Sequence, residues 1–272
     1  GFALLEDAIP AATIDRIGAA FTPLLEHVKG REQELGNVET GDIRVGRGRL
    51  QHPNRYTLQW PWEGALACPE IAEHPALLDL LEAYWGTDDF LITCLHSNNP
   101  YPGSIHQRWH RDISLMSPHV GMERVPHFGV KFPLVDTNEE NGSFEGLPST
   151  QYLADPALEG RYDEIVESGS FPHRTRVNMK RGTLWVQDPR ALHRGTPNRS
   201  SGPRPELVIC YSLRWASGVT GDTVPLIGAE ELEQISERGK RLFGRAQILV
   251  FKCGSIAAPV PETTRIRDGC DD

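Results

Sequence analysis

The sequence lacks the excess of basic residues that nucleic acids and anionic membrane surfaces require. Its 28 lysines and arginines are outnumbered by 37 aspartates and glutamates, so that the formal net charge is −9 at pH 7. A protein that neutralises phosphate groups needs a basic face instead. The sequence also lacks an apolar run of the roughly 20 residues that a membrane-spanning helix needs. Both absences argue against nucleic acids and membranes as partners.

The sequence also lacks the closely spaced cysteine pairs that mark zinc or redox motifs. Five cysteines stand far apart along the chain, at Cys68, Cys94, Cys210, Cys253 and Cys270. An odd number at wide spacing is typical of reduced thiols in a reducing compartment. We therefore expect a cytoplasmic protein whose thiols are chemically inert.

Helical patterns occur in four stretches of the sequence. Apolar residues recur at helical spacing over 11–30, where Thr13 is the expected N-cap, and over 74–86, where Gly86 ends the pattern. Similar patterns return within 151–167 and over 228–244.

The middle of the chain is rich in short strand-like runs bounded by proline, glycine and asparagine. These runs lie at 90–96, 127–135, 174–179, 182–188 and 206–215. We predict a mainly β fold in which flanking helices cover an antiparallel sheet, within a single domain. Its expected parts are a helical N-terminal part (about 1–86), a strand-rich core (about 87–217) and a helical C-terminal segment (about 218–272).

The stretch HQRWHRD, residues 106–112, fits two backbones with different chemistry. On a helix, His106 and His110 would share a face at the spacing of zinc proteases, but Gln107 replaces the glutamate base of that motif. On a strand, His110 and Asp112 point the same way and can chelate one metal ion. Proline and glycine in the preceding loop disfavour a helix. We therefore interpret residues 110–112 as a strand that offers two ligands.

A third ligand has to come from elsewhere in the chain. Downstream, a strand-like run leads through a turn to His193, which is followed by Asn198 and Arg204. Two histidines and one carboxylate on one side of a metal leave three open positions, the facial triad of non-haem iron(II) oxygenases. An arginine beyond the second histidine can fork onto a carboxylate in a way that lysine cannot.

These motifs, in this order, resemble the phytanoyl-CoA dioxygenase family of iron(II)- and 2-oxoglutarate-dependent oxygenases. The resemblance rests on HRD at 110–112, on NEENGSFEGLPST at 138–150, and on His193 with Asn198 and Arg204 after it. It implies a double-stranded β-helix (jelly-roll, cupin-like) core. It also implies that iron is held by His110, Asp112 and His193, and the distal carboxylate of 2-oxoglutarate by Arg204. Gln107 is the nearest match to a glutamine that helps to bind the co-substrate in some relatives.

The sequence departs from the family pattern after the NEENG turn. It reads Leu-Pro-Ser-Thr at 147–150, where the family commonly reads Pro-Gly-Ser-His. We expect this loop to lie away from the iron.

The resemblance implies that iron(II), 2-oxoglutarate and dioxygen act together, with ascorbate as a supporting reductant. The expected reaction oxidises an unactivated C–H bond of a small polar, sugar-like or secondary-metabolite substrate by hydroxylation, cyclisation or desaturation, and releases succinate and CO2. Asp112 argues against halogenation, because halogenating relatives replace this carboxylate with a small residue. Two alternatives stay open, a non-catalytic jelly-roll that binds metal or ligand and a zinc hydrolase. The intact triad together with Arg204 argues against the first, and Arg204, which would have no obvious task in a zinc hydrolase using the same triad, argues against the second.

Residues 41–64, whose pattern predicts a long loop or a ragged hairpin, are the expected lid over the iron. They combine four arginines with two tryptophans that would suit a polar substrate with a C–H face for stacking. These residues are Arg44, Arg47, Arg49, Arg55, Trp60 and Trp62. His106, Arg108 and His127 are further candidates for lining the pocket.

Overall fold

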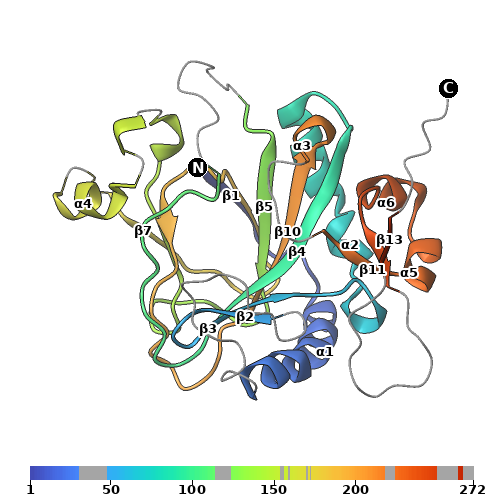
Figure 1. The fold of residues 1–272 in the computed structure, drawn as a ribbon, viewed down its shortest axis with the longest axis horizontal. Helices are drawn as coiled ribbons and strands as arrows, with labels where there is room; N and C mark the ends of the chain where they lie inside the picture. Colours follow the sequence, from blue (N-terminus) through green and yellow to red (C-terminus); the bar gives the residue numbers. More distant parts are fainter. Residues whose placement is uncertain are drawn as a thin grey trace.

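A seven-stranded antiparallel sheet forms the centre of the protein in the computed structural model (Figure 1). The structure describes residues 1–30, 48–113, 124–153, 156–158, 160–169, 171, 173–217, 224–249 and 263–265. The strand order of this main sheet is β1-β8-β5-β10-β4-β3-β2. Its strands are β1 (Phe2–Leu5), β2 (Gly48–His52), β3 (Arg55–Gln59), β4 (Phe90–Pro100), β5 (His127–Pro133), β8 (Leu184–Gln187) and β10 (Glu206–Leu213).

A smaller antiparallel sheet faces the main one. It has the order β7-β6-β9, with β7 (Thr175–Val177), β6 (Phe144–Gly146) and β9 (His193–Arg194). Phe144 bridges the two sheets, because its ring lies 4.2 Å from the ring of Trp185 on β8. We call the side of the main sheet that faces β6 its inner face.

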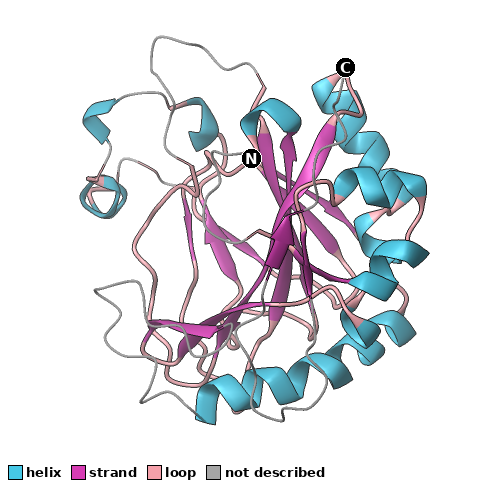
Figure 2. Cartoon of the chain, turned by 45° about the vertical axis from the view of Figure 1, so that its right-hand side comes forward, coloured by secondary structure: helices cyan, strands magenta, loops and turns pink. Residues whose placement is uncertain are grey.

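Most helices gather on the other side of the main sheet, as Figure 2 shows, whereas α4 (Tyr162–Glu167) lies on the side of the smaller sheet, near β7 (Figure 1). The other helices are α1 (Ala11–Gly30), α2 (Pro69–Ala72), α3 (Pro75–Trp85), α5 (Ala229–Gln234) and α6 (Glu237–Leu242). A third small sheet, β11 (Leu226–Gly228), β12 (Gln247–Leu249) and β13 (Thr263–Arg265), lies beside α5 and α6 (Figure 1). None of the helices in the described part of the chain has the length and apolarity that crossing a bilayer requires.

The strands divide their side chains between the two faces of the main sheet, because successive residues of a strand point to opposite sides. On β10, Leu207, Ile209 and Tyr211 belong to the large apolar core that the helices cover. Val208 and Cys210 point the other way, toward the inner face. The inner face therefore carries a different and more polar set of residues than the core.

The main helices and strands lie where the sequence predicted them. Helix α1 spans 11–30, and α3 ends before Gly86, whose φ of 72° is the left-handed conformation that favours glycine after a helix. Thr13 is not the N-cap, however, because α1 begins at Ala11 and the carbonyl of Pro10 accepts from the amide of Ile14. Four of the five predicted strand runs contain β5, β7, β8 and β10, and the fifth, 90–96, is the first part of β4. Strand β1 was not predicted, whereas β2 and β3 pair as an irregular hairpin, one of the two alternatives for residues 41–64.

The expected lid residues do not form a lid where the structure describes them. Trp60 and Trp62 are fully buried in the apolar core, and the ring of Trp62 lies 4.8 Å from that of Phe243. The backbone of Trp62 also pairs with Ile227 on β11. The prediction that these tryptophans stack on a substrate was therefore wrong. Arg44 and Arg47 lie outside the described residues, as does the side chain of Arg49.

We expect Trp62→Ala to lower the free energy of unfolding by about 3–5 kcal/mol, because it removes a buried indole and leaves a cavity. Trp215→Ala is the matched control. Trp215 is 69 % exposed, so its replacement should change stability by no more than about 0.5 kcal/mol. Urea denaturation followed by circular dichroism measures both values. Equal losses in the two variants would contradict the burial of Trp62.

Candidate metal centre

The structure brings His110, Asp112 and His193 together. The Nε2 atom of His193 lies 3.2 Å from Oδ1 of Asp112, and Nε2 of His110 lies 3.6 Å from the same oxygen. The ligand atoms of all three residues lie within 4.8 Å of one another. The three side chains predicted as ligands therefore converge on one point between the two sheets.

A single backbone bridge positions the two histidines. The amide of His110 donates to the carbonyl of His193 at 3.0 Å, and the amide of His193 donates back at the same distance. The two imidazole rings are held side by side as a result, with their centroids 4.4 Å apart. Residues 110–112 do not form the predicted strand, because only His110 pairs and the chain bends at Asp112. Residues 106–112 are not helical either, which excludes the zinc-protease interpretation.

Each histidine directs its Nε2 atom toward the site, because its Nδ1 atom is bound elsewhere. Nδ1 of His110 lies 2.8 Å from the carbonyl oxygen of Arg108, and Nδ1 of His193 lies 2.8 Å from that of Ala191. A carbonyl oxygen only accepts, so each Nδ1 carries the proton and each Nε2 presents a lone pair. This is the tautomer that binds a metal ion through Nε2.

The electrostatics of the site favour a neutral imidazole next to a charged carboxylate. Burial, and then the neighbouring His193, lower the pKa of His110 to about 4. Burial alone would raise the pKa of Asp112, but His193, Lys131 and His110 hold it well below its usual range. Metal ligands need these protonation states, since a protonated imidazole cannot coordinate.

Gln187 on β8 contacts the His193 ring at Nδ1, the ring nitrogen that is not directed toward the metal site. Its Nε2 atom lies 2.9 Å from Nδ1 of His193, and its Oε1 atom is buried with no hydrogen-bond partner among the described residues. Because the Nδ1 proton makes this nitrogen a donor, a half-turn of the carboxamide would place Oε1 as its acceptor, shared with the carbonyl oxygen of Ala191. Phe144 stacks on the same ring with centroids 4.9 Å apart. Neither residue was predicted, because their place depends on how the two sheets face each other.

Arg204 is buried just before β10 and forms an ion pair with Glu206. The sequence did not reveal this partner. The Nη1 atom of Arg204 donates to Glu206 at 3.0 Å, and both side chains are almost fully buried. Arg55 belongs to the same charged group. Burial, and then the like charge of Arg204, lower the pKa of Arg55 to about 9, while Glu206 opposes the shift. The Nε atoms of both arginines have no hydrogen-bond partner in the described part of the chain.

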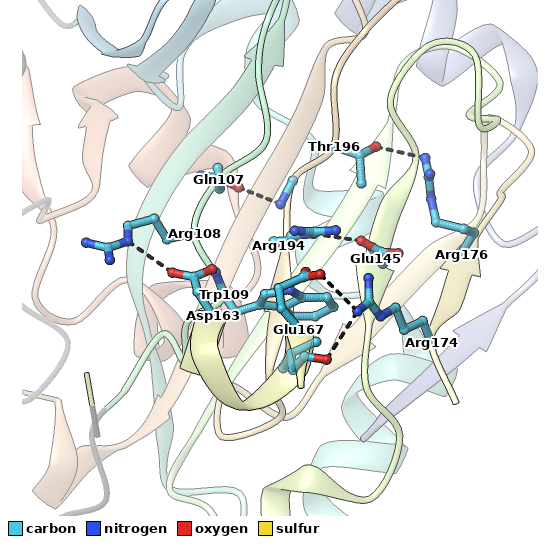
Figure 3. Close-up of polar contacts among 12 residues, drawn as sticks. Gln107, Arg108, Trp109, Glu145, Asp163, Glu167, Arg174, Arg176, Arg194 and Thr196 are labelled. Carbon is cyan, nitrogen blue, oxygen red and sulfur yellow. Dashed lines mark hydrogen bonds and ion pairs between the residues drawn. The ribbon is translucent and has the colours of Figure 1, made fainter. Parts of the chain in front are cut away.

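Gln107 contacts the backbone just after His193. The amide of Gly195 donates to Oε1 of Gln107 at 2.7 Å, and the amide of Gln107 donates to the carbonyl of Gly195 (Figure 3). A Cβ atom at Gly195 would collide with Gln107 and with the guanidinium of Arg55. Glycine at this position therefore allows both side chains to approach. A role of Gln107 in co-substrate binding stays a prediction.

The other candidate pocket residues do not join the triad. His106 and Arg108 are exposed, and Arg108 points toward Asp163, with which it forms an ion pair at 3.0 Å (Figure 3). His127 is buried, and its Nδ1 atom lies 2.7 Å from the hydroxyl oxygen of Ser212. Residues 106–109 form no strand in the structure, so strand alternation does not place His106 and Arg108 on the same side as His110.

The 147–150 loop lies next to the metal centre, against expectation. Thr150 accepts a hydrogen bond from the amide of Leu192 at 2.8 Å, and the amide of Leu147 donates to the carbonyl of Leu192. Leu192 directly precedes His193. The loop therefore fixes the backbone that carries the second histidine, and Thr150 supplies a hydroxyl for this purpose.

Comparison with known proteins agrees with this architecture. The sequence matches the phytanoyl-CoA dioxygenase (PhyH) family over residues 1–205. The chain belongs to this family. Its members are non-haem iron- and 2-oxoglutarate-dependent enzymes, so the chain is an enzyme of this class and not a binding module.

Several solved structures share the fold. HygX from Streptomyces hygroscopicus, determined with nickel and 2-oxoglutarate bound, is 16% identical with a TM-score of 0.57, over 79% of this chain and 84% of its own. AviO1 from Streptomyces viridochromogenes Tue57 is 20% identical with a TM-score of 0.55, over 78% and 89%. SnoN, a non-haem epimerase from nogalamycin biosynthesis, is 18% identical with a TM-score of 0.57, over 78% and 76%. These likenesses confirm the predicted mainly β, cupin-like fold with flanking helices.

We expect Gln187→Met to weaken nickel binding about 10-fold or more, because it removes the amide that supports the Nδ1 proton of His193. Competition against a fluorescent chelator measures the affinity. Gln247→Met, on β12 of the third sheet, is the control and should bind nickel like the wild type. An unchanged affinity in a folded Gln187→Met protein would contradict the supporting role.

Proposed function

We propose that the protein is an iron(II)- and 2-oxoglutarate-dependent dioxygenase that oxidises an unactivated C–H bond of a small polar secondary metabolite. Succinate and CO2 are the co-products. One observation carries the proposal: two imidazole Nε2 atoms and one carboxylate oxygen converge within 4.8 Å. This N2O set matches iron(II), and its one-sided arrangement leaves positions for a co-substrate and dioxygen.

The residues present fit the metal. His110, Asp112 and His193 would hold it, with both imidazoles neutral and the carboxylate charged, as the pKa directions favour. Bound iron(II), with 2-oxoglutarate and dioxygen, supplies the oxidising chemistry, and ascorbate keeps the metal reduced. The protein binds the reactants, orients them and excludes water. A zinc hydrolase would leave Arg204 without an obvious task.

The buried charges on the inner side of the main sheet support the binding of a dianion. Arg55, Arg204 and Glu206 together carry one net positive charge, and two of their N–H groups point to no described partner. Lys131 on β5 adds another buried cation, whose Nζ lies 4.5 Å from the Phe144 ring. We assign the distal carboxylate of 2-oxoglutarate to Arg204, with Glu206 holding the guanidinium in place.

The substrate is proposed to be small and polar. On the inner face, cross-strand pairing joins Thr57 to Asn98, and Gln59 follows Thr57 on the same side of β3; all three side chains are half-buried. Polar groups at such positions suit a ligand with several hydroxyl or amino groups. Of the solved structures, HygX was also determined with hygromycin B, and SnoN comes from nogalamycin biosynthesis. The reduced thiols of Cys68, Cys94 and Cys210 support a cytoplasmic location.

Epimerisation is the second candidate reaction, since SnoN is described as an epimerase. Mass spectrometry of the product separates the alternatives. We expect the product either to gain one oxygen atom or to lose two hydrogen atoms, whereas an epimer keeps the mass of the substrate. The reaction is run with chloride as the sole halide, because Asp112 occupies the position that a halide ligand would need. A chlorinated product would overturn the assignment of Asp112 as an iron ligand.

Arg204→Ala is expected to weaken 2-oxoglutarate binding to the nickel-loaded protein by about 10-fold or more, because a charge-assisted hydrogen bond to the carboxylate is lost. Isothermal titration calorimetry measures the affinity without turnover. Arg108→Ala removes an exposed arginine and should bind 2-oxoglutarate like the wild type. Equal affinities in both variants would show that Arg204 serves only its ion pair with Glu206.

A further inference from the structure

A second group of metal-ligating side chains lies on the inner face and shares no residue with the triad. The Sγ atom of Cys94 lies 3.2 Å from Sγ of Cys210 and 3.0 Å from Nδ1 of His96. All three ligand atoms lie within 4.8 Å of one another. We call these residues the thiol cluster.

Strand pairing creates the thiol cluster. Cys94 on β4 and Cys210 on β10 are directly opposite each other in the sheet, although 116 residues separate them in the chain. His96 follows Cys94 by two residues and therefore points to the same face. No sequence motif predicts this group, because β4 and β10 are far apart in the sequence and only the strand register places the two thiols opposite each other.

The thiol cluster differs from the triad in its ligand chemistry. It offers two sulfur atoms and one nitrogen, whereas the triad offers two nitrogens and one oxygen. Thiolates are soft ligands that select zinc and copper(I), while a carboxylate with two imidazoles suits iron(II). The two sites therefore differ in the metal ion that each prefers.

We propose that Cys94, His96 and Cys210 form a second metal site, which takes a thiophilic ion such as Zn2+ or Cu+. Both thiols lose their protons to solvent when the ion binds, and His96 coordinates through Nδ1. With Zn2+, two thiolates bring the net charge of the site to zero, which suits its buried position. Zinc–sulfur bonds of about 2.3 Å in a tetrahedron need the sulfur atoms about 3.7 Å apart, so a small opening of the pair suffices.

Cobalt(II) provides the direct test, because it absorbs in the near ultraviolet by charge transfer only when thiolates coordinate it. Metal-free wild-type protein is titrated with two equivalents of cobalt(II) under nitrogen, with a reductant that contains no thiol. The thiolate band is expected to appear at a stoichiometry of one per chain. A protein that binds cobalt without this band would overturn the proposal.

Variants assign the band to residues. Cys94→Ser with Cys210→Ser should abolish it, whereas Cys68→Ser, which replaces another buried thiol, should keep it. Asp112→Ala should also keep the band, because the triad contains no sulfur. The inference is independent of the proposed function for this reason. A thiolate band that survives in the folded double variant would contradict the assignment.

A measurement on the wild type avoids any doubt about folding of the variants. In the zinc-loaded protein with iron(II) added first to fill the triad, X-ray absorption at the zinc edge should show sulfur neighbours at about 2.3 Å. Only nitrogen and oxygen neighbours at about 2.0–2.2 Å would mean that zinc sits elsewhere, and the thiol cluster would then be a pair of packed thiols.

Discussion

The backbone bridge between His110 and His193 is the constraint on which the site depends. Two hydrogen bonds of 3.0 Å tie a chain segment without regular structure to the short strand β9. The bridge holds the ring centroids 4.4 Å apart, and the Nδ1 atom of each ring binds the carbonyl oxygen of the residue two positions before it. The Nε2 atoms are thereby fixed before any metal arrives, which lowers the cost of binding it.

The alternation of side chains in the main sheet supplies the surroundings of that site. One face of β10 belongs to the core beneath the helices, and the other presents Val208 and Cys210 to the inner face. Charged groups that would be costly in the core lie on or beside the inner face, where they pair or contact aromatic rings. Glu206 binds Arg204, and Lys131 lies over Phe144 and Trp185. One face of the main sheet thus stabilises the fold, and the other carries the residues proposed to bind ligands.

Local patterns in the sequence were enough to predict the main strands and both long helices, and the resemblance to the family indicated the residues that converge at the metal centre. His110 and Asp112 point to the same site as predicted, although residues 110–112 do not form a strand. The bend at Asp112 also directs both side chains toward one point. The sequence could not show that Trp60 and Trp62 belong to the core. An exposed aromatic loop and a buried segment after a hairpin have the same irregular pattern of residues. The sequence also could not reveal Glu206 beside Arg204, or the thiol cluster, which depend on strand register and on what fills the inner face.

The central claim is that the triad and 2-oxoglutarate share one metal ion. The most direct measurement is anaerobic: iron(II) and 2-oxoglutarate are added to the protein, and the weak visible charge-transfer band of the chelate is recorded. The account predicts this band in the wild type and its loss in Asp112→Ala. Wild-type protein with demonstrably bound iron and 2-oxoglutarate present, but without the band, would contradict it.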